Sequence, residues 1–252
     1  MKFVGMTGAA RALFATAMFL FAAAGPARAG DNPPAPGFDA AGSDPRAIEV
    51  ADRTMEAMGG RAAWDATRVI RWTLFNRSHV WDRWTGDYRL TADTILVIVN
   101  VGTRAGRVWI KGTEVLYPAQ RDEALGKAVS TWINDSYWLV MPYKLKDSGV
   151  TLRFAGEMPA EDGRNADVLE LTFKNVGDTP DNKYRVWVDR ETGLVSQWSY
   201  YRSAADPEPR FTLPWNGWQS FGAIKLATGR GRTDVTDIRV SGEADPAAFA
   251  GP

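Results

Sequence analysis

The stretch that decides the fold is Asp-Pro-Arg-Ala-Ile-Glu-Val-Ala-Asp-Arg-Thr-Met-Glu-Ala-Met-Gly-Gly, residues 44–60. Asp44 is a good N-cap residue and Pro45 suits the first helical position. Apolar side chains then recur at spacings of three and four, as on one face of a helix: Ile48, Ala51, Met55 and Met58. The stretch predicts an amphipathic helix that Gly59-Gly60 ends, and another layer must cover its apolar stripe.

After this helix the sequence changes to the pattern of strands. Ile70, Trp72 and Leu74 alternate with their neighbours, while Thr94–Val101 is apolar on both faces, as in a strand covered on both sides. We expect strands over residues 70–75, 94–101, 108–110, 113–116, 168–173, 184–188, 194–201, 211–221, 224–228 and 233–240. A second short helix is expected over Asp122–Trp132. Trp132–Pro142 is apolar and aromatic, which is typical of a buried strand ending at the proline.

One helix followed by a long run of antiparallel strands predicts the α+β class. We expect a strongly curved antiparallel β-sheet, a half-barrel, wrapped around one or two helices with an apolar cavity between them. Residues 45–252 are expected to form this single β-rich domain. Residues 30–44 are rich in Pro, Gly and Ala, and they predict a flexible leader before it.

The first 29 residues have the layout of a secretory signal peptide. Lys2 and Arg11 precede the apolar run Leu13–Ala24, and Ala27-Arg28-Ala29 places small residues at a cleavage site. The apolar run is too short to span a bilayer in the mature protein. We therefore expect a periplasmic or extracellular protein that is soluble after cleavage, with no transmembrane segment in its mature form.

The composition excludes several classes of function. The chain has 30 basic and 30 acidic residues, and three of the basic ones lie in the predicted signal peptide. The remaining slight acidic excess argues against a nucleic-acid partner. The chain has no cysteine, so it has no disulfide, thiolate metal site or cysteine nucleophile. With a single histidine, we expect neither a metal site nor a cofactor.

Four features resemble a known group of proteins. The helix ending in Met58-Gly59-Gly60 before Ala63-Trp64 is similar to the start of many secreted members of the lipoprotein-carrier superfamily (LolA/LolB-like), and Val188–Leu194 resembles a late hairpin of that group. The segments His79–Gly86 and Trp132–Pro142 look like an uncharacterised secreted bacterial group within or near it. The resemblance implies a curved sheet wrapped on helices around a cavity for acyl chains, and it implies no catalytic residue.

We therefore expect a non-catalytic protein that binds an acyl chain or another hydrophobic, lipid-like ligand. Aromatic and methionine side chains adapt to irregular apolar ligands, and a lysine at the rim suits a carboxylate or phosphate. The candidate ligand-binding residues are Trp72, His79, Trp81, Trp84, Trp132, Tyr137, Trp138, Met141 and Lys144.

Two alternatives remain open at this stage. The first is a secreted hydrolase acting on envelope glycans or esters, with His79, Asp82 and Asp135 as candidate acid or base groups. In a serine hydrolase Ser136 would be the nucleophile, although no Gly-x-Ser-x-Gly motif presents it. The second is a protein whose aromatic surface docks an envelope protein, for which an exposed aromatic patch would be the mark.

Overall fold

The computed structural model describes residues 32–174, 176–178 and 181–252. The predicted signal peptide, residues 1–29, lies outside the described residues. Among the helices that the described part of the chain forms, none is both long enough and apolar enough to cross a membrane.

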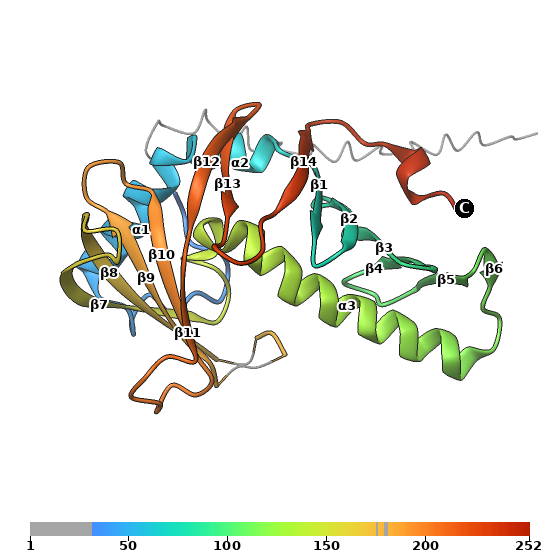
Figure 1. The fold of residues 1–252 in the computed structure, drawn as a ribbon, viewed down its shortest axis with the longest axis horizontal. Coiled ribbons are helices and arrows are strands. Elements are labelled where there is room, and N and C mark those ends of the chain that lie inside the picture. Colours follow the sequence, from blue (N-terminus) through green and yellow to red (C-terminus); the bar gives the residue numbers. More distant parts are fainter. Residues whose placement is uncertain (1–31, 175, 179–180) are drawn as a thin grey trace, which may run out of the picture.

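Antiparallel strands build most of the fold (Figure 1). In the described residues the larger sheet has the strand order β14-β1-β2-β3-β4-β5-β6, formed by Thr236–Ser241, Val69–Leu74, Arg77–Asp82, Asp87–Ala92, Ile95–Asn100, Gly106–Ile110 and Thr113–Glu114. The second sheet has the order β11-β10-β9-β8-β7, formed by Phe211–Pro214, Val195–Tyr201, Lys183–Asp189, Asn165–Phe173 and Val150–Pro159. A hairpin of β12 (Asn216–Phe221) and β13 (Ile224–Gly229) lies between the two sheets.

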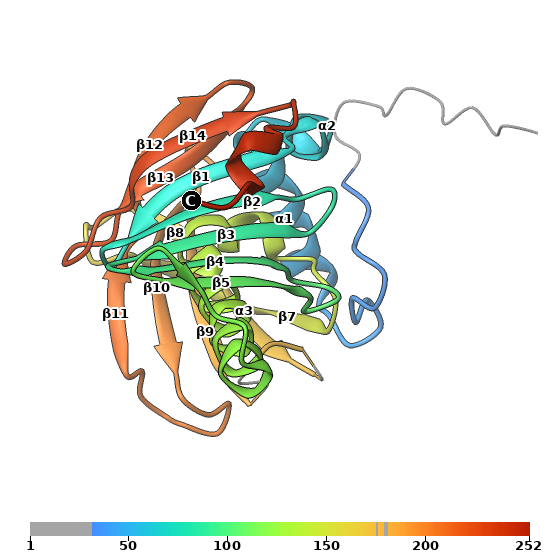
Figure 2. The same cartoon turned by 90° about the vertical axis from the view of Figure 1, so that its right-hand side faces the viewer.

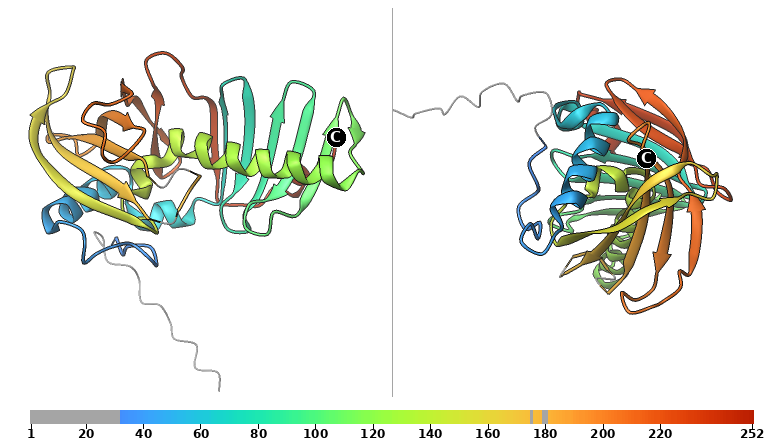
Figure 3. Two further views of the ribbon diagram at one scale, coloured as in Figure 1. Left: turned by 90° about the horizontal axis from the view of Figure 1, so that it is seen from below. Right: turned by 90° about the vertical axis from the view of Figure 1, so that its left-hand side faces the viewer.

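The long helix α3, Pro118–Val140, runs from beneath the larger sheet to the second sheet (Figures 1 and 3). Figure 2 looks nearly along this helix and shows the strands curving around it. Its buried residues Leu125, Ala128 and Leu139 share one core cluster with apolar residues of β1, β3, β4 and β5. The α+β class and the curved, open sheet wrapped on helices are therefore confirmed.

The helix predicted from residue 45 is α1, Pro45–Ala57, and α2, Gly60–Ala66, follows it directly. The buried face of α1 carries Ala47, Val50, Ala51, Thr54 and Met55, so Ile48 lies at its edge. The covering layer is the second sheet, since Ala47, Val50 and Ala51 share a core cluster with residues of β7, β8, β9 and β10. Asp44 precedes the helix, but its carboxylate accepts hydrogen bonds from Arg153 and the Phe154 amide instead of capping it.

Three expectations about local structure are wrong in type or in extent. The expected short helix over Asp122–Trp132 and the expected strand over Trp132–Pro142 are parts of the single helix α3, followed by the 3-10 helix η1, Met141–Lys144. An apolar run of this kind does not distinguish a strand from a buried helix until the layers around it are known. The expected strand 211–221 is two strands, because the fully buried Trp215 separates β11 from β12.

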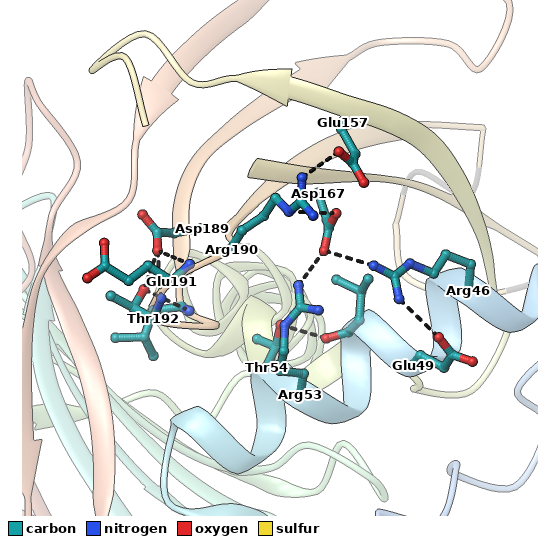
Figure 4. A network of polar contacts seen from close by, with 12 residues as sticks. Arg46, Glu49, Arg53, Thr54, Glu157, Asp167, Asp189, Arg190, Glu191 and Thr192 are labelled. Atoms are coloured by element: carbon teal, nitrogen blue, oxygen red, sulfur yellow. Dashed lines mark hydrogen bonds and ion pairs between the residues drawn. The ribbon is translucent and has the colours of Figure 1, made fainter. Parts of the chain in front are cut away.

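A charged network fastens α1 to the second sheet (Figure 4). The carboxylate of Asp167 on β8 is fully buried and forms an ion pair with Arg53 of α1. Arg46 approaches the same carboxylate at 3.6 Å and Arg190 at 3.8 Å. Asp189, at the end of β9, accepts hydrogen bonds from the Glu191 and Thr192 amides and so closes the turn into β10.

Residues 35–44, within the segment predicted as a leader, run beside the start of β7. The Asp39 amide donates to the Val150 carbonyl and the Asp44 amide donates to the Leu152 carbonyl. At the other end of the chain, Arg89 of β3 donates to the carbonyls of Ala248 and Ala250. The last residues, with the 3-10 helix η2 (Pro246–Phe249), thereby cover part of the outer face of the larger sheet.

The glycine between α1 and α2 is expected to be indispensable for stability. Gly59 has a φ of +115°, and a Cβ there would lie 2.2 Å from the Ala223 carbonyl oxygen. Gly59→Ala should lower the free energy of unfolding by about 2–4 kcal/mol, because strain adds to overpacking. Urea denaturation measures this loss.

The matched control is Gly112→Ala. Gly112 also has a positive φ, +78°, but a Cβ there would meet nothing within 4 Å. The free energy of unfolding of this control should fall by only about 1 kcal/mol, because alanine is less stable than glycine in a left-handed backbone conformation. Equal losses in the two variants would contradict the close approach of the β12–β13 turn to Gly59.

Candidate functional site

The orientation of α3 is fixed by a buried polar cluster. Arg77 of β2 donates to both carboxylate oxygens of Asp135, at 2.8 and 3.0 Å. Asp135 is fully buried on α3, and its Oδ2 lies 3.3 Å from Nε2 of His79, also fully buried. The other ring nitrogen of His79 lies 2.7 Å from the Tyr88 hydroxyl. One helix and two strands are thereby joined through side chains inside the core.

His79 suits this cluster as a neutral ring. Burial, followed by the charge of Arg77, lowers the pKa of His79 from 6.5 to about 3, and a backbone hydrogen bond with Leu74 opposes this only in part. The nearby carboxylate of Asp135 is already balanced by Arg77. We assign the tautomer in which the Tyr88 hydroxyl donates to Nδ1 and the Nε2 proton faces Asp135. Trp72 stacks on the ring, with centroids 4.5 Å apart.

A second cation holds the carboxyl end of α3. Arg230 is fully buried, and its Nε and Nη2 donate to the Trp138 carbonyl at 3.0 and 2.7 Å. Its guanidinium lies 3.5 Å above the ring of Trp215. A cation at this end of a helix satisfies free carbonyls and opposes the helix dipole. Burial lowers the pKa of Arg230 to about 9.

With α3 held in this way, a cleft opens between its last turns and the second sheet. We call it the α3 cleft. It encloses about 450 Å³, within the range of small-molecule sites. Its walls are mainly apolar or aromatic, and they come from α3, β7, β8 and β9: Trp132, Ile133, Tyr137, Trp138, Val150, Phe173 and Tyr184.

Polar side chains also line the α3 cleft: Ser130, Asn134, Ser136, Lys144, Asp147, Ser148, Asp178 and Asn182. The Tyr137 hydroxyl and the Trp132 Nε1 are buried and make no hydrogen bond with the described residues. The Tyr137 ring leans on Tyr184 at a centroid distance of 5.3 Å. Burial raises the pKa of Tyr137 well above its ordinary value, so the hydroxyl stays a donor. At the border, Lys144 and Asp147 form an ion pair of 3.0 Å.

On the other side of η1 lies a smaller pocket of about 230 Å³, which we call the basic pocket. Its basic side chains are Arg61 of α2, Arg83 after β2, and Lys144 and Lys146 in and after η1. Lys144 and Asp147 line both the α3 cleft and the basic pocket. The two cavities therefore meet at η1.

The structure brings together some of the residues that the sequence singled out. Trp132, Tyr137, Trp138 and Lys144 line the α3 cleft. Trp81 lines the basic pocket and contacts Trp132 edge to face, with centroids 5.2 Å apart. Three others line neither cavity and are fully buried: Trp72, His79 and Met141. Trp84 is 58% exposed at the turn after β2, under the guanidinium of Arg68.

Of the candidate acid and base groups of the hydrolase alternative, His79 and Asp135 lie together in the core, 3.3 Å apart, and Asp82 lies apart from them. Asp82 is paired with Arg68 at 2.9 Å and accepts hydrogen bonds from the Trp84 and Thr85 amides. It lies on the face of β2 opposite His79. His79, Asp82 and Asp135 line neither of the two cavities. Among the described residues, no group of three or more His, Cys, Asp or Glu side chains is arranged to hold a metal ion.

Sequence reasoning missed several residues of the two cavities, among them Arg83. It shares a face of the chain with His79 and Trp81, and this alternation is visible in the sequence. Its neighbours in the basic pocket come from α1, α2 and η1, which lie far from it along the chain. Nothing local in the sequence brings these segments together.

Comparison with known proteins gives likeness of structure only. No family model matches the sequence, and no curated protein matches it. A protein of the DUF1329 family from Desulfovibrio piger is similar in structure, with a TM-score of 0.44, 16% identity, and 82% of this chain and 98% of that one covered. A LolA superfamily protein from Nitrosomonas europaea is similar with a TM-score of 0.35, 12% identity, and 81% and 97% covered. The second belongs to the superfamily that the sequence resembles.

The buried histidine predicts how stability depends on pH. The unfolded chain takes up a proton on His79 near pH 6.5, whereas the folded chain does so only near pH 3. The free energy of unfolding should therefore fall as the pH drops through this window, by up to about 1.4 kcal/mol per pH unit. Urea titrations of the wild type at pH 7 and pH 5 measure the fall.

His79→Gln is the comparison, because it keeps a polar side chain beside Tyr88 and removes the titration. Between pH 7 and pH 5 the free energy of unfolding of this variant should fall less than that of the wild type, by up to about 2 kcal/mol. The other ionisable groups are the same in both proteins, so their contributions cancel in the comparison. The same fall in both would mean that folding does not shift the pKa of His79.

Proposed function

We propose that this protein is a non-catalytic binder of an acyl chain or a comparable apolar ligand, which it holds in the α3 cleft. The observation that carries the proposal is the cleft itself: about 450 Å³, with walls from one helix and three strands of the second sheet. Burial of apolar ligand surface against such walls supplies most of the affinity, at about 25 cal/mol per Å² before the costs of association.

Two polar groups would orient the ligand. The Tyr137 hydroxyl is buried without a partner among the described residues, and a buried donor left unpaired costs about 1–3 kcal/mol. An ester or carbonyl oxygen on the ligand would accept that hydrogen bond. The Trp132 Nε1 is a second such donor. The site is thus mostly apolar with a few directed donors, as small-molecule sites generally are.

The location of the protein is also a proposal. The signal-peptide pattern in residues 1–29 supports export, and we propose the periplasm or the exterior as the location. Handling of envelope lipids or lipoproteins is the context that fits an exported binder of acyl chains.

The first experiment is native mass spectrometry of the protein purified from the periplasm, followed by organic extraction. A co-purifying lipid-sized mass would support the proposal and define the class of ligand. If the protein is free of ligand and no apolar probe is retained, the proposal fails.

A cleft variant separates binding from folding. Ile133→Ser removes one aliphatic wall and should weaken binding of the neutral probe N-phenylnaphthylamine about five- to thirty-fold, since the lost contact is worth about 1–2 kcal/mol. The fluorescence increase of the probe reports its binding. Trp138→Ala is a poorer choice, because Trp138 also packs on Trp198 and Phe211.

Leu116→Ser is the matched control. Leu116 is an aliphatic side chain that is 76% exposed and lines neither cavity. It should bind the probe as the wild type does. Equal affinities for all three proteins would place the probe outside the α3 cleft.

A further inference from the structure

The basic pocket carries an unbalanced positive charge. Among its four basic side chains, three have a carboxylate partner in the described residues: Arg61 with Asp65 at 2.8 Å, Lys144 with Asp147 at 3.0 Å, and Lys146 with Asp52. Arg83 forms no ion pair with any of the described residues, and its Nη1 donates only to the carbonyls of Trp64 and Thr67.

The guanidinium of Arg83 is held in a fixed orientation. It lies 3.5 Å above the ring of Trp64, and the opposite side of that ring stacks on Tyr143 at a centroid distance of 4.0 Å. Tyr143 is anchored in turn, because its hydroxyl lies 2.8 Å from the Lys225 carbonyl. Nε and Nη2 of Arg83 make no hydrogen bond with the described residues. A planar, fixed pair of donors of this kind matches the two oxygens of a carboxylate or phosphate.

Arg83 keeps its charge despite its surroundings. Burial lowers the pKa of Arg83 to about 10, so it stays protonated at neutral pH. Asp65, which is paired with Arg61, attracts Arg83 only from a distance. A bound anion in direct contact would stabilise this half-buried cation.

The basic pocket also lies next to the α3 cleft. Lys144 and Asp147 line both cavities, and Trp81 of the basic pocket contacts Trp132 of the cleft. A molecule with an anionic end and an apolar end could therefore fill the two together.

We infer that the basic pocket binds an oxyanion, a carboxylate or a phosphate, through Arg83, as the head group of the amphiphile whose apolar part lies in the α3 cleft. The amphiphile rests on the proposed function, whereas the oxyanion site depends on the basic pocket alone. Lys144 at the shared border would contribute a second positive charge close to the head group.

Calorimetry with a pair of ligands of equal chain length tests the inference. Decanoate and decanol differ in charge, so wild type should bind decanoate at least about tenfold more tightly. Arg83→Gln should lower the affinity for decanoate by about tenfold and leave that for decanol unchanged. Arg83→Lys should keep most of the preference. Added salt should weaken decanoate binding in the wild type and not decanol binding.

Arg107→Gln is the control for removing an arginine. Arg107 also stacks on a tryptophan, 4.6 Å above the ring of Trp109, but it lies outside both cavities. It should leave both affinities unchanged. Thermal melts of each variant check that the fold is kept, and the salt dependence of the wild type tests the inference even if Arg83→Gln is unstable.

Inorganic phosphate distinguishes a free anion from a head group. Decanoate binding that depends on Arg83, without binding of phosphate alone, assigns the site to an amphiphile. Phosphate binding that depends on Arg83, with neither decanoate nor decanol bound, upholds the oxyanion site and overturns the proposed function. Equal affinities for decanoate and decanol, together with no phosphate binding, overturn the inference and leave the proposed function standing.

Discussion

The ion pair between Asp135 and Arg77 is the interaction on which the rest of the structure depends. It fixes the rotation of α3 against the larger sheet, since Asp135 is fully buried and held through both carboxylate oxygens. Successive residues of an α-helix are about 100° apart. With Asp135 turned toward β2, Ile133 and Tyr137 must point to nearly the opposite side, where the α3 cleft lies. Loss of this buried pair would leave an uncompensated charge and no fixed rotation for the helix.

The carboxyl end of α3 is held at a second point, by a residue from late in the chain. Arg230, after β13, binds the Trp138 carbonyl and stacks on Trp215. Tyr143 in η1 reaches the carbonyls of Met58 and Lys225. The two cavities on either side of η1 therefore depend on segments more than eighty residues apart in the chain. The two cavities differ in charge: the α3 cleft exposes mainly apolar surface, whereas the basic pocket carries three paired cations and one arginine that forms no ion pair with the described residues.

Prediction from the sequence succeeded where the signal is local. Alternation and apolar runs identified β1, β4, β5 and β6 of the larger sheet but not β3, and the spacing of apolar residues identified α1. It failed at Trp132–Pro142, since the density of aromatic residues there suits a strand as well as a buried helix. The same density nonetheless pointed to Trp132, Tyr137 and Trp138, which the structure places in one cleft. Trp72 and His79 also lie in a segment that is rich in aromatic residues. They are nevertheless buried in the core, where their rings stack on each other.

The sequence by itself determined the class of the fold, because the order of one helix and many alternating strands leaves few ways to bury the apolar faces. It also determined the aromatic character of the cavity, since the rings are concentrated in a few segments. Only the tertiary structure decided which rings face a cavity and which face the core, because a helix must be rotated and placed before its faces have an inside and an outside. It alone decided the charge of the basic pocket. Whether a cation is balanced depends on which acids the fold brings to it. In the described residues, acids pair with Arg61, Lys144 and Lys146 but form no ion pair with Arg83.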